Sequence, residues 1–227
     1  MRRVAFFDID GTLVTGGPAK DAFCEAMIDT FGTMGNVEAV SFGGKTDPQI
    51  ARELLVGCGY HFEQFEEQFP SLWQSYTERL EDKLARCPMQ VLPGVRELLN
   101  ALKSMGEIGV GLLTGNIARG AELKLNSAEL REHFALGSYG SDHEERNHLS
   151  KIVLERARNM WDPELPSEHT VVIGDTPRDI SCGLAIGART LAVATGSFTP
   201  SQLAEAGADK VVTDLTETDK ILSYLAA

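Results

Sequence analysis

The feature that most constrains the fold is the alternation of short, largely apolar runs with helical patterns along most of the chain. The runs cover residues 3–7, 108–113, 170–173, 190–194 and 210–212, and each one ends at a polar or glycine-rich turn. Helical patterns lie between them, at 93–105, 149–160 and 177–186, where apolar residues recur on one face. Buried strands that alternate with helices form parallel sheets covered on both sides. We therefore predict an α/β fold with a doubly wound, Rossmann-like parallel sheet.

Residues 15–88 interrupt this alternation. No second strand pattern follows the first strand, and the patterns that do follow are helical, the longest at 62–84. Within that stretch Pro70 is expected to break or kink the helix, because proline lacks the backbone donor that a helix interior needs. Glycine and proline residues at 16–18 and at 87–88 provide hinges at the two ends. We predict an α/β core formed by residues 1–14 and 89–227, with an α-helical cap domain inserted at 15–88.

Composition and charge narrow the classes of partner. The chain has 33 acidic and 21 basic side chains, a formal net charge of −12, and no Lys/Arg-rich run. Nucleic acid and anionic membranes are therefore excluded as expected partners. No apolar run approaches the length of a membrane span, and the four cysteines form no CxxC pair. These features predict a cytoplasmic protein; they do not indicate an oligomeric state.

Polar residues that could take part in catalysis or ligand binding follow three of the predicted strands. Asp8 and Asp10 follow the first strand, Thr114 follows the second, and Asp175 follows the third, with Asp179 one turn later. In an open parallel sheet, ligands bind beyond the carboxyl ends of the strands. Carboxylates brought together there repel one another unless a cation neutralises them. A hard divalent ion is the natural partner, and magnesium is the usual one where a phosphate completes its coordination.

At these positions the sequence resembles the haloacid dehalogenase-like hydrolases, in particular their phosphoglycolate phosphatase-like branch. The segment from Asp8 to Val14 matches the DxDGT(L/V) signature, and Leu112 to Thr114 matches the second motif, an apolar pair ending in Ser or Thr. Gly174, Asp175 and Asp179 match the fourth motif, GDxxxD. The resemblance spans nearly the whole chain, with the insertion placed where many members carry a helical cap.

The resemblance implies roles for the acidic residues. Asp8 would be the nucleophile that forms an aspartyl-phosphate. Asp10 would protonate the leaving alcohol and then activate the hydrolytic water. Asp8, Asp175 and the backbone carbonyl of Asp10 would bind Mg²⁺, and Asp179 would orient the metal shell or bind the ion through water.

The resemblance also implies substrate-binding groups. Thr114, with the backbone N–H groups of Gly115 and Asn116, would hold phosphoryl oxygens at the start of a helix. Lys45 lies in a Gly-Lys-Thr-Asp segment that is similar to a segment of related caps, which faces the active site. It is a candidate ligand for a substrate carboxylate or phosphate, and a surface turn before a helix is the alternative interpretation.

The third motif of the family, a lysine often followed by proline, has no direct match. Two cations compete for its place, Arg146 and Lys151. Family spacing favours Arg146, which directly precedes the predicted helix at 149–160, whereas Lys151 falls inside the helical pattern as a solvated side chain. Arginine keeps the charge and can bind carboxylate and phosphate through its planar fork.

Together these observations predict a magnesium-dependent phosphoric monoester hydrolase that acts on a small phosphorylated metabolite, phosphoglycolate or a sugar phosphate. A sugar phosphomutase of the same superfamily would keep the same aspartates and is the first alternative. A non-catalytic binding or regulatory member of the fold is the alternative of another class.

Overall fold

Six parallel strands form the central sheet of the computed structural model, which describes residues 3–61 and 65–227. Their spatial order is β5-β4-β1-β6-β7-β8, so β1 is central and the order reverses beside it. This is the doubly wound arrangement that the sequence predicts. The strands are β1 (Arg3–Phe7), β4 (Ile108–Leu113), β5 (Leu136–Ser138), β6 (Thr170–Gly174), β7 (Arg189–Val193) and β8 (Lys210–Val212).

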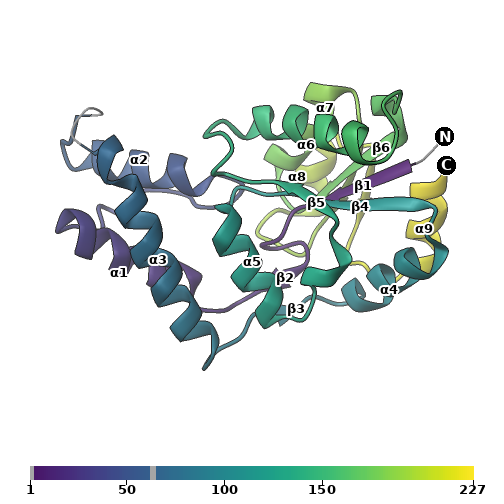
Figure 1. Cartoon of the computed structure of the whole chain (residues 1–227). Helices are drawn as coiled ribbons and strands as arrows, with labels where there is room; N and C mark the ends of the chain where they lie inside the picture. The colour runs from purple at the N-terminus through teal and green to yellow at the C-terminus, as the bar shows by residue number, and fades with distance from the viewer. Residues whose placement is uncertain (1–2, 62–64) are drawn as a thin grey trace.

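Helices cover both faces of this sheet, which explains why its strands are apolar throughout. Side chains alternate along β1, so Ala5 and Phe7 join the core on one face, while Val4 and Phe6 join the core on the other. In Figure 1, α6 and α7 lie above the sheet, and α4 and α9 lie below it. The helices of this part of the chain are α4 (Val95–Met105), α5 (Ala118–Ser127), α6 (Arg146–Met160), α7 (Pro177–Ile186), α8 (Pro200–Glu205) and α9 (Thr218–Ala226).

Between β1 and β4 the chain forms a separate group of helices, here called the helical segment (residues 15–88). It contains α1 (Ala19–Phe31), α2 (Asp47–Gly57), a 3-10 turn at Glu66–Gln68 and α3 (Phe69–Leu84). Aromatic side chains pack α1 against α3, with the rings of Phe23 and Tyr76 edge to face at 5.5 Å. Figure 1 shows this group standing beyond one edge of the sheet, with α5 between it and the sheet.

Several features of the fold differ from the sequence predictions or were not predicted, among them α8 and α9. The helix expected at 62–84 begins at Phe69, with Pro70 in its first turn, where a missing backbone donor costs nothing. Residues 62–64 of that prediction lie outside the described residues. The short strand β5 was not predicted. The antiparallel pair of β2 (Val14–Thr15) and β3 (Gln90–Val91) was not predicted either; it links the two stretches of chain that lead into and out of the helical segment.

Within the described residues, no helix combines the length and the apolar character that crossing a membrane would require.

Candidate active site

The polar residues that follow β1, β4 and β6 meet at one edge of the sheet. These three strands are neighbours and run parallel, so their carboxyl ends point the same way. A cavity of about 280 Å³ lies there, between the sheet and the helical segment. Its walls include Asp8, Thr114 and Asp175 from the sheet side, and Phe23 and Tyr76 from the helical segment. The structure therefore brings together the polar residues that the sequence places at these three strand ends.

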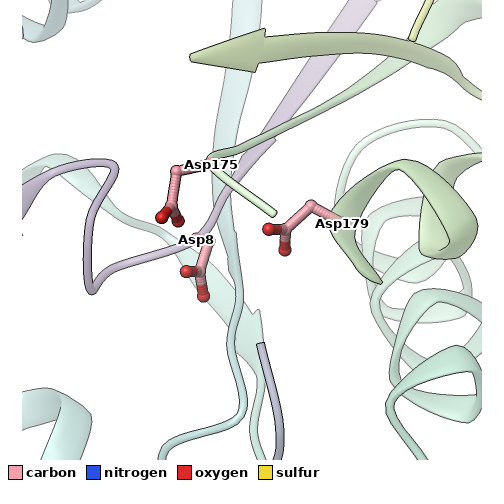
Figure 2. A group of neighbouring side chains, drawn as sticks. All are labelled: Asp8, Asp175 and Asp179. Atoms are coloured by element: carbon pink, nitrogen blue, oxygen red, sulfur yellow. The ribbon is translucent and has the colours of Figure 1, made fainter. Parts of the chain in front are cut away.

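Three buried carboxylates form the centre of the site. Asp8 follows β1, Asp175 follows β6, and Asp179 lies in the first turn of α7; each offers an oxygen within 4.8 Å of the others. Figure 2 shows the three carboxylates converging from these separate segments on one region. Asp179 also caps its helix, because its Oδ2 accepts hydrogen bonds from the backbone N–H and the hydroxyl of Thr176. Asp179 therefore both caps α7 and belongs to the acidic cluster.

Arg146 links two of these carboxylates. Its Nη2 donates to Asp8 Oδ1 at 2.8 Å and to Asp179 Oδ1 at 2.6 Å, and the side chain is 5% exposed. Arg146 is the first residue of α6, whereas Lys151 is exposed further along the same helix. Of the two candidates for the place of the third-motif lysine, Arg146 and Lys151, the structure brings Arg146 to the acidic cluster.

Burial disfavours the charged forms of these carboxylates. It raises the pKa of Asp8 to about 7, against the opposing effect of the Arg146 guanidinium. It also raises the pKa of Asp175 to about 8, with the negative charges of Asp179 and Asp8 adding to the shift. Three carboxylates against one guanidinium leave two negative charges uncompensated when all are ionised. The cluster is therefore short of positive charge.

Asp10 lies apart from this cluster and has its own partners. Lys124 Nζ donates to both carboxylate oxygens of Asp10 at 2.8 Å, and Asn116 Nδ2 donates to Oδ2 at 2.8 Å. The protein surroundings disfavour charge on Asp10, but the Lys124 ammonium and these hydrogen bonds outweigh that effect and lower its pKa. The Asp10 side chain is 46% exposed, towards the cavity that it lines.

The loop after β4 supplies hydroxyl and amide groups to the same cavity. Thr114 is fully buried, and its Oγ1 accepts hydrogen bonds from Asn116 Nδ2 at 2.8 Å and from the Asn116 backbone N–H at 3.3 Å. With both acceptor positions used, the Thr114 hydroxyl hydrogen is directed elsewhere and can serve as a donor. Gly115 and Asn116 complete the cavity wall.

The loop that precedes α2 docks on this same turn. The Asp47 backbone N–H donates to the carbonyl oxygen of Gly115 at 2.8 Å, and Asp47 Oδ2 accepts from the Ile117 N–H at 2.8 Å. Nearby, Thr46 Oγ1 donates to the carbonyl oxygen of Glu144 at 2.7 Å. Thr46 also caps α2 by accepting from the backbone N–H of Gln49, so this turn both begins a helix and contacts the loops at the carboxyl edge of the sheet.

Two residues of that docked turn have charged side chains at the cavity. Lys45 lines the cavity, and its ammonium pairs with Glu53 of α2. The Asp47 carboxyl is partly buried, and burial raises its pKa to about 6. Lys45 therefore lies at the cavity, in a turn that precedes a helix, which fits both interpretations of the sequence; its acidic partner was not indicated by the sequence.

Comparison with known proteins places this geometry in a family. The model of the haloacid dehalogenase-like hydrolases matches residues 3–187, which include β1, β4, β6 and all the acidic residues described above. The chain belongs to the haloacid dehalogenase-like hydrolases.

Curated relatives refine this assignment. The N-acetylmuramic acid 6-phosphate phosphatase of Pseudomonas putida is 27% identical over 97% of this chain and 96% of its own length. Phosphoglycolate phosphatase 1 of Pseudomonas aeruginosa is 26% identical over 95% of this chain and 78% of its own length. The chain is therefore an enzyme, a haloacid dehalogenase-like phosphatase of the phosphoglycolate phosphatase-like branch.

Solved structures share the fold of this haloacid dehalogenase-like chain over its full length. A hydrolase from Pseudomonas syringae superposes with a TM-score of 0.73 at 20% identity and covers all of both chains. CbbY from Rhodobacter sphaeroides, solved in complex with phosphate, gives a TM-score of 0.69 at 19% identity over 96% of each chain.

A metal ion fits the acidic cluster of this haloacid dehalogenase-like phosphatase. Haloacid dehalogenase-like phosphatases generally use one, and Asp8, Asp175 and Asp179 are oxygen ligands of the kind that hard divalent cations prefer. Two glycines leave room beside Asp175 Oδ2: a Cβ at Gly11 or Gly196 would lie 2.3 or 1.8 Å from that oxygen. A divalent ion would supply the two positive charges that the cluster lacks.

Sequence reasoning missed Lys124 and the docking role of Asp47. Lys124 lies on α5, where its position shares a face with the buried residues Ile117, Ala121 and Ala128. A lysine on the apolar face of a predicted helix is the signal that could have identified it. Asp47 gave no comparable signal, because an acidic residue in the first turn of a helix is common.

Proposed function

We propose that this enzyme is a magnesium-dependent phosphatase that hydrolyses a small phosphomonoester through a phospho-aspartyl intermediate on Asp8. The observation that carries the proposal is the convergence of Asp8, Asp175 and Asp179, buried at the carboxyl edge of the sheet, with Arg146 bound to the first and the third. The helical segment at 15–88 would act as the cap over this site, since its residues form the opposite wall of the cavity.

Mg²⁺ would be held by Asp8, Asp175 and the backbone carbonyl of Asp10, with Asp179 supporting the shell. When bound, the ion would offset the negative charge between the nucleophilic carboxylate and the phosphate. This need is supported by the raised pKa of Asp8, which must lose its proton to act as a nucleophile.

In the first half-reaction, a carboxylate oxygen of Asp8 attacks phosphorus and the bond from phosphorus to the ester oxygen breaks. The protonated Asp10 gives its proton to that oxygen, and the alcohol leaves. In the second half-reaction, the ionised Asp10 takes a proton from water as the water oxygen attacks phosphorus. The bond to Asp8 then breaks, which releases inorganic phosphate and restores the carboxylate.

The remaining residues would hold the phosphoryl oxygens. The Thr114 hydroxyl has a hydrogen to donate, as derived above, and the guanidinium of Arg146 adds positive charge beside Asp8. Gly115 and Asn116 would contribute backbone N–H groups at the start of α5. Lys45, paired with Glu53, would act further out, on the part of the substrate that differs between phosphomonoesters.

The substrate type rests on the relatives. One is an N-acetylmuramic acid 6-phosphate phosphatase and another is a phosphoglycolate phosphatase, and a structural neighbour was solved with xylulose-1,5-bisphosphate. The compounds in these names are a phosphorylated two-carbon acid and phosphorylated sugars. We assign the enzyme to the same range of small phosphorylated metabolites.

The test is release of inorganic phosphate from a panel of such esters and from p-nitrophenyl phosphate, with Mg²⁺ and with EDTA. We expect hydrolysis that requires Mg²⁺ and that Asp8→Asn lowers on the order of 1,000-fold or more. Asp82→Asn, an exposed carboxylate of α3, is the matched control and should keep the wild-type rate. Full activity of Asp8→Asn would refute the nucleophile. Transfer of phosphate from a bisphosphate to an isomeric sugar phosphate, without release to water, would instead identify a phosphomutase.

A further inference from the structure

The pairing of Lys124 with Asp10 has a geometry that packing alone does not require. The ammonium of Lys124 is 2.8 Å from both oxygens of the Asp10 carboxylate, and the lysine side chain is 6% exposed. Asn116 adds a third hydrogen bond, to Oδ2. The carboxylate is thus held at both oxygens, although half of the Asp10 side chain faces the cavity.

Burying an ammonium is costly, and it becomes tolerable only when the charge is paired and hydrogen-bonded. Lys124 lies on the buried face of α5 among apolar residues, where a methionine of similar length would pack at a lower desolvation cost. The charge of Lys124 therefore contributes to its interaction with Asp10 and not to packing of the core. Its effect is to fix the rotation of a carboxylate that would otherwise be held at Oδ2 alone, by Asn116.

We infer that Lys124 is a positioning residue, which holds the Asp10 carboxylate at the place where it exchanges protons with the leaving group and with water. This inference rests on the proposed function, because it assigns Asp10 the acid and base role. The proton moves between Asp10 and an oxygen of the alcohol or the water. Lys124 neither gives nor takes a proton, and it acts on the rate only through Asp10.

Two lysine variants separate charge from packing. Lys124→Met keeps the length of the side chain and removes its charge, and it is expected to lower kcat by about 10- to 100-fold, a part of the 10²- to 10⁴-fold that acid–base catalysis contributes. KM should change by less than about threefold, since the ground-state contacts of the substrate remain. Lys124→Arg restores a donor to both oxygens and should recover most of the rate. The matched control is Lys103→Met, an exposed lysine of α4 that pairs with Glu132.

A double-mutant cycle with Asp10→Asn decides between positioning and a general structural role. The substrate is p-nitrophenyl phosphate, whose leaving group needs little help from an acid, so that the cycle compares rates limited by the second half-reaction, in which Asp10 activates water. If Lys124 acts through Asp10, then Lys124→Met should change the rate of the Asp10→Asn enzyme by less than about twofold. A loss of the same factor in both backgrounds would overturn the inference, as would a Lys124→Met enzyme with the wild-type kcat.

The outcomes also separate this inference from the proposed function. A wild-type enzyme that releases phosphate in the presence of Mg²⁺, together with an additive cycle, would reject Lys124 as a positioning residue and leave the phosphatase standing. A wild-type enzyme without phosphatase activity would reject both. Thermal unfolding of each variant shows that it is folded; if Lys124→Met does not fold, the Lys124→Arg and Lys124→Gln variants are put through the same cycle.

Discussion

Replacing Gly115 by alanine should separate the helical segment from the catalytic edge. A Cβ at this position would lie 2.0 Å from the carbonyl oxygen of Lys45 and 3.0 Å from Thr46 Cα. Ordinary contact begins near 3.4 Å, so the docked turn must retreat by about 1.4 Å. Gly115 does not have a positive φ, so the substitution introduces a steric contact without backbone strain.

The cost follows from the contacts that this shift would break. Three hydrogen bonds of 2.7–2.8 Å hold the turn, namely those of the Asp47 N–H to Gly115, of the Ile117 N–H to Asp47, and of the Thr46 hydroxyl to Glu144. At about 1 kcal/mol each, their loss weakens docking by about 3 kcal/mol. Since each 1.4 kcal/mol corresponds to a factor of ten, kcat/KM should fall by about 100-fold if catalysis requires the docked turn.

The assay is steady-state hydrolysis, in Mg²⁺, of the ester that the substrate panel selects. Gly43→Ala is the matched control: it lies in the same turn, has no positive φ, and its Cβ would meet only Ser41 Oγ, at 4.0 Å. Thermal unfolding should show both variants folded. A Gly115→Ala enzyme whose kcat/KM stays within threefold of the wild type would refute the view that catalysis needs this docked turn.

Two further predictions concern the acidic cluster. Arg146→Ala should lower kcat/KM by roughly 100-fold or more, because it removes the cation that joins Asp8 to Asp179, whereas Lys151→Ala, an exposed residue, should stay within about twofold; equal rates would reject the assignment of Arg146. In EDTA, the free energy of unfolding should fall as the pH rises from about 4 to 8. Asp8 and Asp175, with pKa values of about 7 and 8, keep protons in the folded state that the unfolded state has lost. The slope is up to about 1.4 kcal/mol per pH unit for each such group. Thermal melts at pH 5, 6.5 and 8 should show this fall in stability. Mg²⁺ should reduce the dependence on pH, and Asp175→Asn should flatten it. A wild-type protein whose melting temperature in EDTA does not fall between pH 5 and 8 would contradict the raised pKa values of Asp8 and Asp175.

The sheet and its acidic edge could be predicted because their signals are local in the sequence. An apolar run that ends in Asp8, or in Asp175, contains both the strand and the residue that its carboxyl end presents. The parallel arrangement then brings separate strand ends together without any knowledge of side-chain contacts. Arg146 was favoured over Lys151 by family spacing and by its place ahead of the helix predicted at 149–160, although that helix begins at Arg146 itself.

The remaining features depend on contacts between distant segments. Lys124 is 114 residues from Asp10; its place on an apolar helix face could have indicated burial, but nothing local in the sequence indicates its partner. Strands β2 and β3 have two residues each, too short for a pattern, and β5, Leu-Gly-Ser, lacks the β-branched residues of the equally short β8. The start of α3 was set too early because apolar residues continue before Phe69, although Pro70 marks the beginning of the helix and not a kink within it.

The guanidinium of Arg146 has a consequence for activity in alkaline solution. An arginine stays protonated at any pH at which a protein remains folded, and here its carboxylate partners raise its pKa further, although burial opposes them. A lysine in the same place would lose its charge when the solution became sufficiently basic. The ion pairs of Arg146 with Asp8 and Asp179 therefore persist at high pH. Any decline in turnover at high pH has to originate in other groups of the site.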